Sequence, residues 1–157
     1  MIYAPLPTLV FSLDERRFAL RLAAVERVFA VAEIASLPAA PRIVLGVINI
    51  RGRVVPVVDV RKRFGLPARE IVLSDKFILG RTSNRSVALL VDAVMGVVEL
   101  PQVATTHAAA IVPGLNYVEG VARLSDGMVF IHDLETFLSL EEATALEAAL
   151  PLNPANR

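Results

Sequence analysis

The 157-residue sequence contains no cysteine and no tryptophan, and its only histidines are His107 and His132. Without cysteine there are no disulfides, thiolate metal sites or cysteine nucleophiles, and two histidines offer little material for a general base. The glycine-rich patterns of nucleotide-binding loops and the Gly-x-Ser-x-Gly pattern of serine hydrolases are also missing. These absences predict a protein without catalytic activity, metal or cofactor, in which both histidines are structural.

Long apolar runs are missing as well, since no stretch approaches the roughly 18 uninterrupted apolar residues of a membrane span. The N-terminus lacks a basic start and is interrupted by Pro5 and Pro7, which argues against a signal peptide. A content of 55% hydrophobic and 20% charged residues excludes disorder and fits one domain, or two small ones that share a core. We expect a cytoplasmic protein with no direct membrane insertion.

Net charge is zero, but the two signs are unevenly distributed along the chain. Residues 1–91 hold 14 basic and 7 acidic residues, whereas residues 92–157 hold 2 basic and 9 acidic residues. The two parts therefore carry net charges of +7 and −7. Such opposite fields favour contact between unlike parts of neighbouring molecules.

Short β-type runs are abundant, and 22 valines contribute to them. Alternating or continuous apolar runs bounded by turn residues predict ten strands. Ser139 and Glu142 form a capping-box pattern, which predicts a helix that Pro151 ends. The predicted strands are residues 8–13, 18–22, 24–31, 46–50, 53–58, 76–81, 86–91, 93–100, 117–124 and 127–132.

The first five predicted strands resemble the second five. Residues 46–66 align without gaps with residues 120–140, and 5 of the 21 pairs are identical. This similarity indicates that the chain is a duplicated five-stranded unit. We expect each unit to form a small barrel, because a closed barrel avoids the open edges that short sheets expose. The fold class predicted is mainly β, with a first barrel over 8–75, a second over 76–138 and a C-terminal helix over 139–150.

A basic cluster lies within residues 42–63 and contains a single acidic residue, Asp59, whose position is typical of a helix N-cap. Nucleic acid binding by this cluster is the alternative function. No aromatic residue interleaves the cluster to stack bases, so contact with carboxylates of a partner is the favoured interpretation. The cluster consists of Arg42, Arg51, Arg53, Arg61, Lys62 and Arg63.

The segment GVINIRGRVVPVVDVRKRFGL, residues 46–66, resembles the signature of the CheW family, the coupling proteins of bacterial chemotaxis arrays. The resemblance extends over nearly the whole chain, with Ile50 and Val60 as conservative departures. It implies two intertwined or abutting five-stranded barrels of the SH3-like kind. It also implies a non-catalytic adaptor that binds the cytoplasmic tip of a chemoreceptor and the regulatory domain of the histidine kinase CheA, at receptor arrays on the inner membrane.

The same resemblance suggests a receptor-binding site around the turn at Asn49, Arg51 and Gly52. Glu26 matches an acidic position that lies near the signature arginine, so we expect an exposed ion pair between Glu26 and Arg51. The alternative is that Arg51 and Gly52 only form a hairpin turn, and both interpretations are compatible.

Two further surfaces are assigned to partners. Val25, Val28, Ile48 and Ile50 are candidates for a groove that accepts a receptor helix, with core packing as the competing interpretation. A loop around four other residues is the candidate kinase-binding segment. The opposite charges of the two chain parts also predict a weak head-to-tail self-association that falls with rising salt. The kinase-binding candidates are Leu37, Pro38, Pro41 and Ile43.

Overall fold

The structure is a computed structural model that describes residues 5–101, 118–124 and 127–150. Ten strands dominate it, as the sequence pattern predicts, and their bounds agree closely with the predicted ranges. The strands are β1 (Pro5–Leu13), β2 (Arg16–Arg21), β3 (Val25–Ala30), β4 (Val44–Ile50), β5 (Arg53–Val58), β6 (Lys76–Arg81), β7 (Ser86–Val91), β8 (Ala93–Pro101), β9 (Val118–Leu124) and β10 (Gly127–His132).

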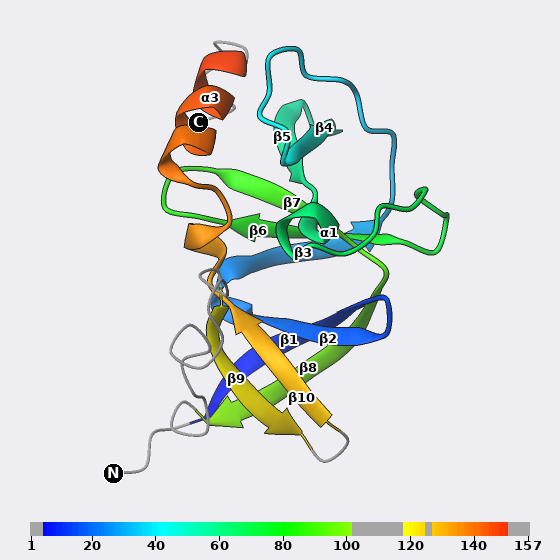
Figure 1. The fold of residues 1–157 in the computed structure, drawn as a ribbon, viewed down its shortest axis with the longest axis vertical. Coiled ribbons are helices and arrows are strands. Elements are labelled where there is room, and N and C mark those ends of the chain that lie inside the picture. Colours follow the sequence, from blue (N-terminus) through cyan, green and yellow to red (C-terminus); the bar gives the residue numbers. More distant parts are fainter. Residues whose placement is uncertain (1–4, 102–117, 125–126, 151–157) are drawn as a thin grey trace.

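The strands form two five-stranded sheets, which appear one above the other in Figure 1. The lower sheet has the order β8-β1-β2-β10-β9, and the upper sheet has the order β3-β6-β7-β5-β4. Each sheet contains one parallel pair, β2 with β10 and β5 with β7, and its other pairs are antiparallel. The two sheets thus share one topology, which confirms the predicted duplication.

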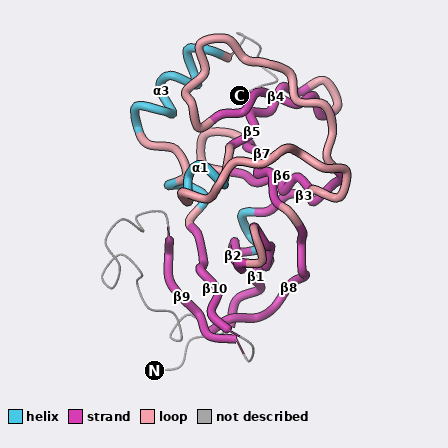
Figure 2. The backbone as a smooth tube through the Cα atoms, turned by 45° about the vertical axis from the view of Figure 1, so that its right-hand side comes forward, coloured by secondary structure: helices cyan, strands magenta, loops and turns pink. Residues whose placement is uncertain are grey.

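The predicted boundary between barrels at residues 75 and 76 does not describe the sheets. Residues 8–75 and 76–138 are the two sequence repeats, but β1 and β2 pair with β8 and β10, while β6 and β7 pair with β3 and β5. Each repeat therefore gives its first two strands to the sheet of the other repeat. Equivalent strands carry the same apolar pattern and fit either sheet, so the pattern does not specify which copy they join. Figure 2 shows the chain crossing between sheets after β2 and after β7.

The exchange of strands places apolar residues on both faces of β1 and β2. Val10 and Ala19 pack against Val129 in the core of the lower sheet, whereas Phe11 and Leu20 join a larger cluster with residues of the upper sheet. That larger cluster is continuous from one sheet to the other and also takes up side chains of the C-terminal segment. The two sheets therefore share a core and form one folding unit.

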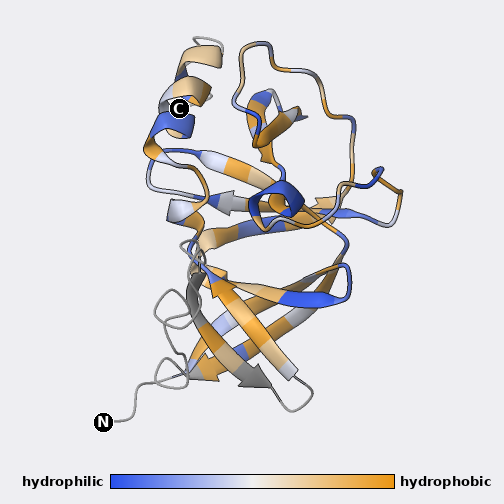
Figure 3. Ribbon diagram, viewed as in Figure 1, coloured by the Kyte–Doolittle hydropathy of each residue, from blue (hydrophilic) through white to orange (hydrophobic). Residues whose placement is uncertain are grey.

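The helices are short. Helix α1 (Val60–Arg63) begins after Asp59, whose carboxylate accepts a hydrogen bond from the Lys62 backbone N–H at 3.0 Å. The predicted C-terminal helix is α3 (Leu140–Ala149), and its capping box forms between Ser139 and Glu142 as expected. Among the described residues, no helix has the length and apolar character needed to cross a membrane. Figure 3 shows hydrophilic residues at α1 and at the turn between β1 and β2.

Candidate functional site

The signature turn forms a tight hairpin between β4 and β5. Ile50 pairs with Arg53, which leaves Arg51 and Gly52 as a two-residue loop with φ values of 52° and 84°. Two successive positive φ values match the right-handed twist of a hairpin, and glycine adopts the second without steric cost. The Asn49 side chain accepts a hydrogen bond from the Gly52 N–H at 2.8 Å, so the turn is fixed and the Arg51 side chain is exposed. The predicted hairpin turn is confirmed.

The predicted ion pair between Glu26 and Arg51 is wrong. The Glu26 carboxylate instead accepts a hydrogen bond from the Ser86 hydroxyl at 3.0 Å. The Ser86 hydroxyl oxygen in turn accepts a hydrogen bond from the Arg53 guanidinium at 2.8 Å. Arg53 lies on β5 and so extends over the sheet, whereas Arg51 lies in the turn beyond it. Ser86, buried at the start of β7, thus links Glu26 to the hairpin. The sequence shows no signal for this, because Ser86 is 60 residues from Glu26 and 33 from Arg53.

The four apolar residues predicted to form a receptor groove differ in exposure: three are at least partly exposed, and one is buried in the core. Val28 is exposed on β3, an edge strand of the upper sheet, and Val25 and Ile50 are half-buried. Ile48 is only 3% exposed and packs in the core of the upper sheet, because alternation along β4 turns it away from solvent. The proposal that Ile48 contacts a receptor is therefore wrong, while the other three side chains remain accessible in whole or part.

The candidate kinase-binding loop divides in the same way. Pro38 is exposed, and Leu37 and Pro41 are half-buried. Ile43 is 3% exposed and belongs to the shared core, and its carbonyl accepts a hydrogen bond from the Asp59 N–H at 2.7 Å. Ile43 therefore anchors the loop and is not a contact residue.

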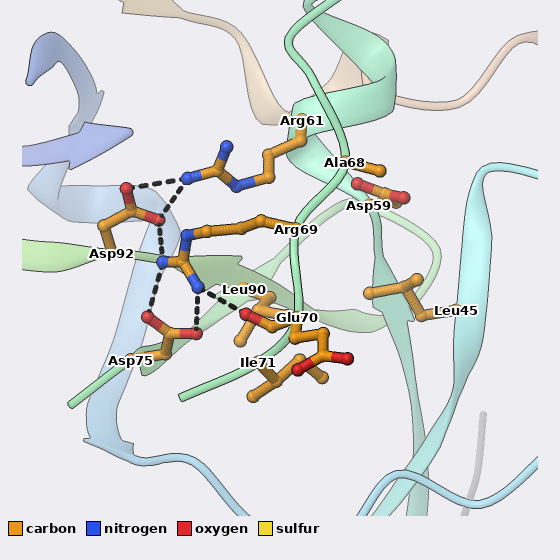
Figure 4. Close-up of a pocket in the computed structure, with 10 residues that line it drawn as sticks. All are labelled: Leu45, Asp59, Arg61, Ala68, Arg69, Glu70, Ile71, Asp75, Leu90 and Asp92. Atoms are coloured by element: carbon orange, nitrogen blue, oxygen red, sulfur yellow. Dashed lines mark hydrogen bonds and ion pairs between the residues drawn. The ribbon is translucent and has the colours of Figure 1, made fainter. Parts of the chain in front are cut away.

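A ladder of alternating acidic and basic side chains lies where the chain crosses between the sheets. Arg61 of α1 binds Asp14 in the turn between β1 and β2, at 2.8 Å, and Asp92 between β7 and β8, also at 2.8 Å. Asp92 also binds Arg69, which binds the buried Asp75 at 2.7 Å (Figure 4). The side chains of the ladder follow one another in the order Asp14–Arg61–Asp92–Arg69–Asp75. Their ion pairs join four separate segments of the chain.

The ladder lowers the pKa of each of its carboxyl groups below the usual range. For Asp14 the main cause is the hydrogen bond from Arg61. Burial opposes the shift at Asp92 and Asp75, but hydrogen bonds outweigh it, from the Asp14 N–H and Arg61 to Asp92 and from Arg69 to Asp75. The pKa of each arginine is raised in turn, mainly by hydrogen bonds to Asp14 for Arg61 and to Asp75 for Arg69. All five groups are therefore ionised at neutral pH.

A pocket of about 260 Å³ opens beside the ladder. Figure 4 shows Arg61, Arg69 and their carboxylate partners on one side, with Leu45, Leu90 and Ile71 around the rest. Arg61, Arg69, Asp75 and Asp92 are paired within the ladder, and the rest of the lining is apolar apart from Asp59 and Glu70. The residues that line the pocket are Leu45, Asp59, Arg61, Ala68, Arg69, Glu70, Ile71, Asp75, Leu90 and Asp92.

Two of the six residues of the basic cluster of residues 42–63 contact carboxylates inside the molecule. Arg61 is held by the ladder and Arg63 forms an ion pair with Glu142 of α3. Arg53 donates to Ser86, and the Lys62 ammonium donates to the Arg42 carbonyl at 3.2 Å. The expectation that these arginines face a partner is therefore wrong for Arg61 and Arg63, and nothing in their arrangement supports the nucleic acid alternative.

Neither histidine takes part in the ladder or lines the pocket among the described residues. His132 is buried and stacks on Phe64, with ring centroids 4.3 Å apart, and on Phe137 at 5.9 Å. This packing agrees with the structural role expected for it. His107 lies outside the described residues.

The molecule consists of two interleaved five-stranded sheets of the same topology, and it presents an exposed hairpin. These features define the class of protein as a duplicated β-sheet module. The chain belongs to the CheW-like domain family, whose model matches residues 7–142. It is 30% identical over 139 residues to the chemotaxis protein CheW of Rhizobium meliloti, covering 87% of this chain and 90% of that protein.

Other relatives give the same result. The chain is 35% identical over 94 residues to the chemotaxis protein CheW of Thermotoga maritima, covering 60% of this chain and 62% of that protein. The crystal structure of the scaffolding protein TtCheW from Thermoanaerobacter tengcongensis matches with a TM-score of 0.80 and 29% identity. That match covers 88% of this chain and 95% of the other. The fold predicted from the sequence is therefore the fold of the family.

Proposed function

We propose that this protein is a chemotaxis adaptor that couples chemoreceptors to the histidine kinase CheA. Its membership of the CheW-like family supports this role, as do the relatives named as chemotaxis proteins and the TtCheW structure described as a scaffolding protein. The role requires binding surfaces and no catalytic step. We place the protein in the cytoplasm, associated with receptor arrays at the inner membrane.

The observation that carries the proposal is the fixed hairpin of β4 and β5, which hydrogen bonds through Ser86 connect to the exposed edge strand β3. Because Asn49 holds the turn, the backbone at Arg51 is already ordered and loses little conformational entropy when a partner binds. The hydrogen bonds from Ser86 to Glu26 and from Arg53 to Ser86 tie β3 to the same hairpin. We assign Arg51, Gly52, Asn49 and Glu26, with Val25, Val28 and Ile50 beside them, to contact with the receptor tip.

The kinase regulatory domain is assigned to the loop that contains Leu37, Pro38 and Pro41. A bridge between Ala35 and Val47 holds the start of this loop, with both backbone hydrogen bonds at 2.8 Å, and Ile43 anchors its end. Proline and the anchored ends limit its conformations, which favours binding. Receptor and kinase are thus given different surfaces of one sheet.

Pull-down by a receptor tip and by the kinase regulatory domain tests both assignments. Arg51→Glu is expected to lose receptor binding and keep kinase binding, and Pro38→Glu is expected to do the opposite. Arg16→Glu, an exposed arginine on β2 in the other sheet, is the matched control and is expected to bind both partners. Folded Arg51→Glu protein that still binds both partners contradicts the receptor site.

Weak head-to-tail association between unlike ends of the molecule is also proposed, with strength that falls as salt rises. Its support is the charge division along the chain, part of which remains free at the exposed Arg42, Arg51 and Arg81. Association measured by light scattering that is unchanged between low and high salt contradicts it.

A further inference from the structure

A buried hydroxyl connects two of the strands assigned to the receptor surface. Ser86, the first residue of β7, is only 4% exposed. Its hydroxyl donates to the Glu26 carboxylate at 3.0 Å and accepts from the Arg53 guanidinium at 2.8 Å. Because both charged groups contact the same oxygen, they lie within about 6 Å of each other. One small side chain thus holds a carboxylate of β3 and a guanidinium of β5 together.

The strand order explains why a third strand supplies this connection. In the upper sheet β6 and β7 separate β3 from β5, so Glu26 and Arg53 are not on neighbouring strands. β5 and β7 run parallel, and Arg53 and Ser86 are their first residues, so both lie at the same end of the sheet. Alternation places Ser86 on the face of Ala88 and Arg53 on the face of Val55, and these two neighbours belong to the core of the upper sheet. The polar contact therefore lies at one end of that core.

The backbone at Glu26 is irregular in a way that suits this contact. The register of β3 on β6 shifts between Val25 and Arg27, so Glu26 is the extra residue of a β-bulge. Bulges change the direction of a side chain relative to the regular alternation, and they are frequent at sheet edges and beside functional sites. β3 is an edge strand, and its bulge places the Glu26 carboxylate within hydrogen-bonding distance of Ser86.

The two arginines of the hairpin differ in their partners. Arg53 is held by Ser86, beside Glu26. The Arg51 side chain is exposed and makes no hydrogen bond or ion pair with any of the described residues. With its carboxylate held at Ser86, Glu26 does not neutralise Arg51. The surface therefore presents a fixed carboxylate and, on the turn, a guanidinium that is available to a partner.

We propose that Ser86 is a positioning residue of the receptor surface, which fixes Glu26 and Arg53 and so leaves Arg51 as the guanidinium of the hairpin that a partner meets. This inference rests on the proposed receptor contact. Ser86 is buried and acts through its two neighbours, without touching the partner itself. Side chains that are ordered before binding lose less conformational entropy on binding, so the hydroxyl strengthens the contact.

Binding titrations with a soluble chemoreceptor tip fragment, and separately with the kinase regulatory domain, test the assignment. Ser86→Ala is expected to weaken binding of the receptor fragment about threefold to tenfold, the effect of a lost hydrogen bond, and to leave kinase binding unchanged. Ser83→Ala is the matched control, because its hydroxyl also donates to a carboxylate, that of Glu135, at 3.0 Å in the connection between β6 and β7. It is expected to bind both partners like the unmodified chain.

The outcomes separate this assignment from the proposed function. If the unmodified chain binds the receptor fragment and Ser86→Ala binds it equally well, the assignment is overturned and the receptor site stands. Equal weakening of receptor and kinase binding by Ser86→Ala also overturns it, because a general loss of structure affects both. If the unmodified chain does not bind the receptor fragment, the proposed function fails and the assignment fails with it.

A double-mutant cycle with Glu26→Ala distinguishes positioning from an independent structural effect. In the Glu26→Ala background no carboxylate remains for the hydroxyl to hold. Ser86→Ala is therefore expected to weaken receptor binding less in that background than in the unmodified chain. The same factor in both backgrounds overturns the assignment.

Nuclear magnetic resonance of the arginine side chains tests the contact in the free protein. The guanidinium protons of Arg53 are expected to exchange with water more slowly than those of Arg51, because Arg53 donates to a buried oxygen. Ser86→Ala is expected to remove this difference. Equal exchange of the two guanidinium groups in the unmodified chain overturns the positioning role without reference to any partner.

Discussion

Asp92 lies between β7 and β8, where the chain crosses from one sheet to the other. Its carboxylate accepts hydrogen bonds from Arg61, Arg69 and the Asp14 N–H, and its own N–H donates to the Ser12 carbonyl at 3.0 Å. These partners are distant in sequence, so composition and local pattern do not reveal the ladder. The Arg51–Gly52 turn, in contrast, was predictable because a hairpin turn is specified by adjacent residues.

Asp92→Asn is expected to lower the free energy of unfolding at neutral pH by about 1–3 kcal/mol, because charge-assisted hydrogen bonds are lost in a partly buried site. The pKa of Asp92 is lowered from 3.8 in the folded state. Its contribution is therefore complete above about pH 4 and is lost as the pH falls through the lowered pKa. Urea unfolding across this range should show the variant and the unmodified chain converging in acid. Glu33→Gln, an exposed carboxylate outside the ladder, serves as control.

Gly46 occupies a position where no side chain fits. A Cβ on Gly46 would lie 2.2 Å from the Ala35 carbonyl oxygen, in the bridge that holds the start of the Leu37–Pro41 loop. Gly46→Ala should therefore lower the free energy of unfolding by about 2–3 kcal/mol, measured by denaturant titration. Gly127→Ala is the matched control, since its φ of 147° is close to the 155° of Gly46 but nothing lies within 4 Å. Equal losses would show that backbone strain alone is responsible.

The elements themselves were predictable because their signals are local. Alternation located the ten strands, and the capping box located α3. The exchange of β1 and β2 with β6 and β7 was not predictable from the repeat, since equivalent strands carry equivalent patterns. The choice depends on chain connection: only three residues, Leu22–Ala24, link β2 to β3, and this short link carries the chain from one sheet into the other.

Helix α3 depends on its first turn. Ser139→Ala removes the hydroxyl that accepts the Glu142 N–H at 3.1 Å, and is expected to cost about 1 kcal/mol of stability. Ser139→Asp supplies another acceptor and should restore most of the loss. The two variants are compared by thermal unfolding. A Ser139→Asp protein no more stable than Ser139→Ala would contradict the capping role.

For the whole molecule, the charge division persists when the chain is divided by sheet, at +6 and −6 compared with +7 and −7 for the division at residue 91. Residues 25–91, which form the upper sheet, contain 11 basic and 5 acidic residues, and the remaining residues contain 5 and 11. Among the described residues, five ion pairs join these parts within one chain: Arg61 with Asp14 and with Asp92, Arg69 with Asp92, Arg63 with Glu142, and Arg85 with Glu147. Much of the predicted complementarity therefore acts inside the molecule.

Stability should accordingly fall as ionic strength rises, by up to about 1 kcal/mol, because the partly exposed pairs are screened. Glu147→Gln removes one of the pairs between the parts and should show a smaller response to salt. Urea unfolding at low and high sodium chloride measures both. An equal response by the two proteins would show that the pairs between the parts do not cause it.

The interleaved sheets also constrain the order of events during synthesis. β1 and β2 leave the ribosome first, but their partners β8 and β10 are made more than 70 residues later. β3 to β7 are contiguous and are synthesised earlier, so the upper sheet is expected to assemble first. Until β8 and β10 are made, the β1–β2 hairpin exposes an apolar surface. A nascent chain stalled after β7 is therefore the species of this protein most in need of a chaperone.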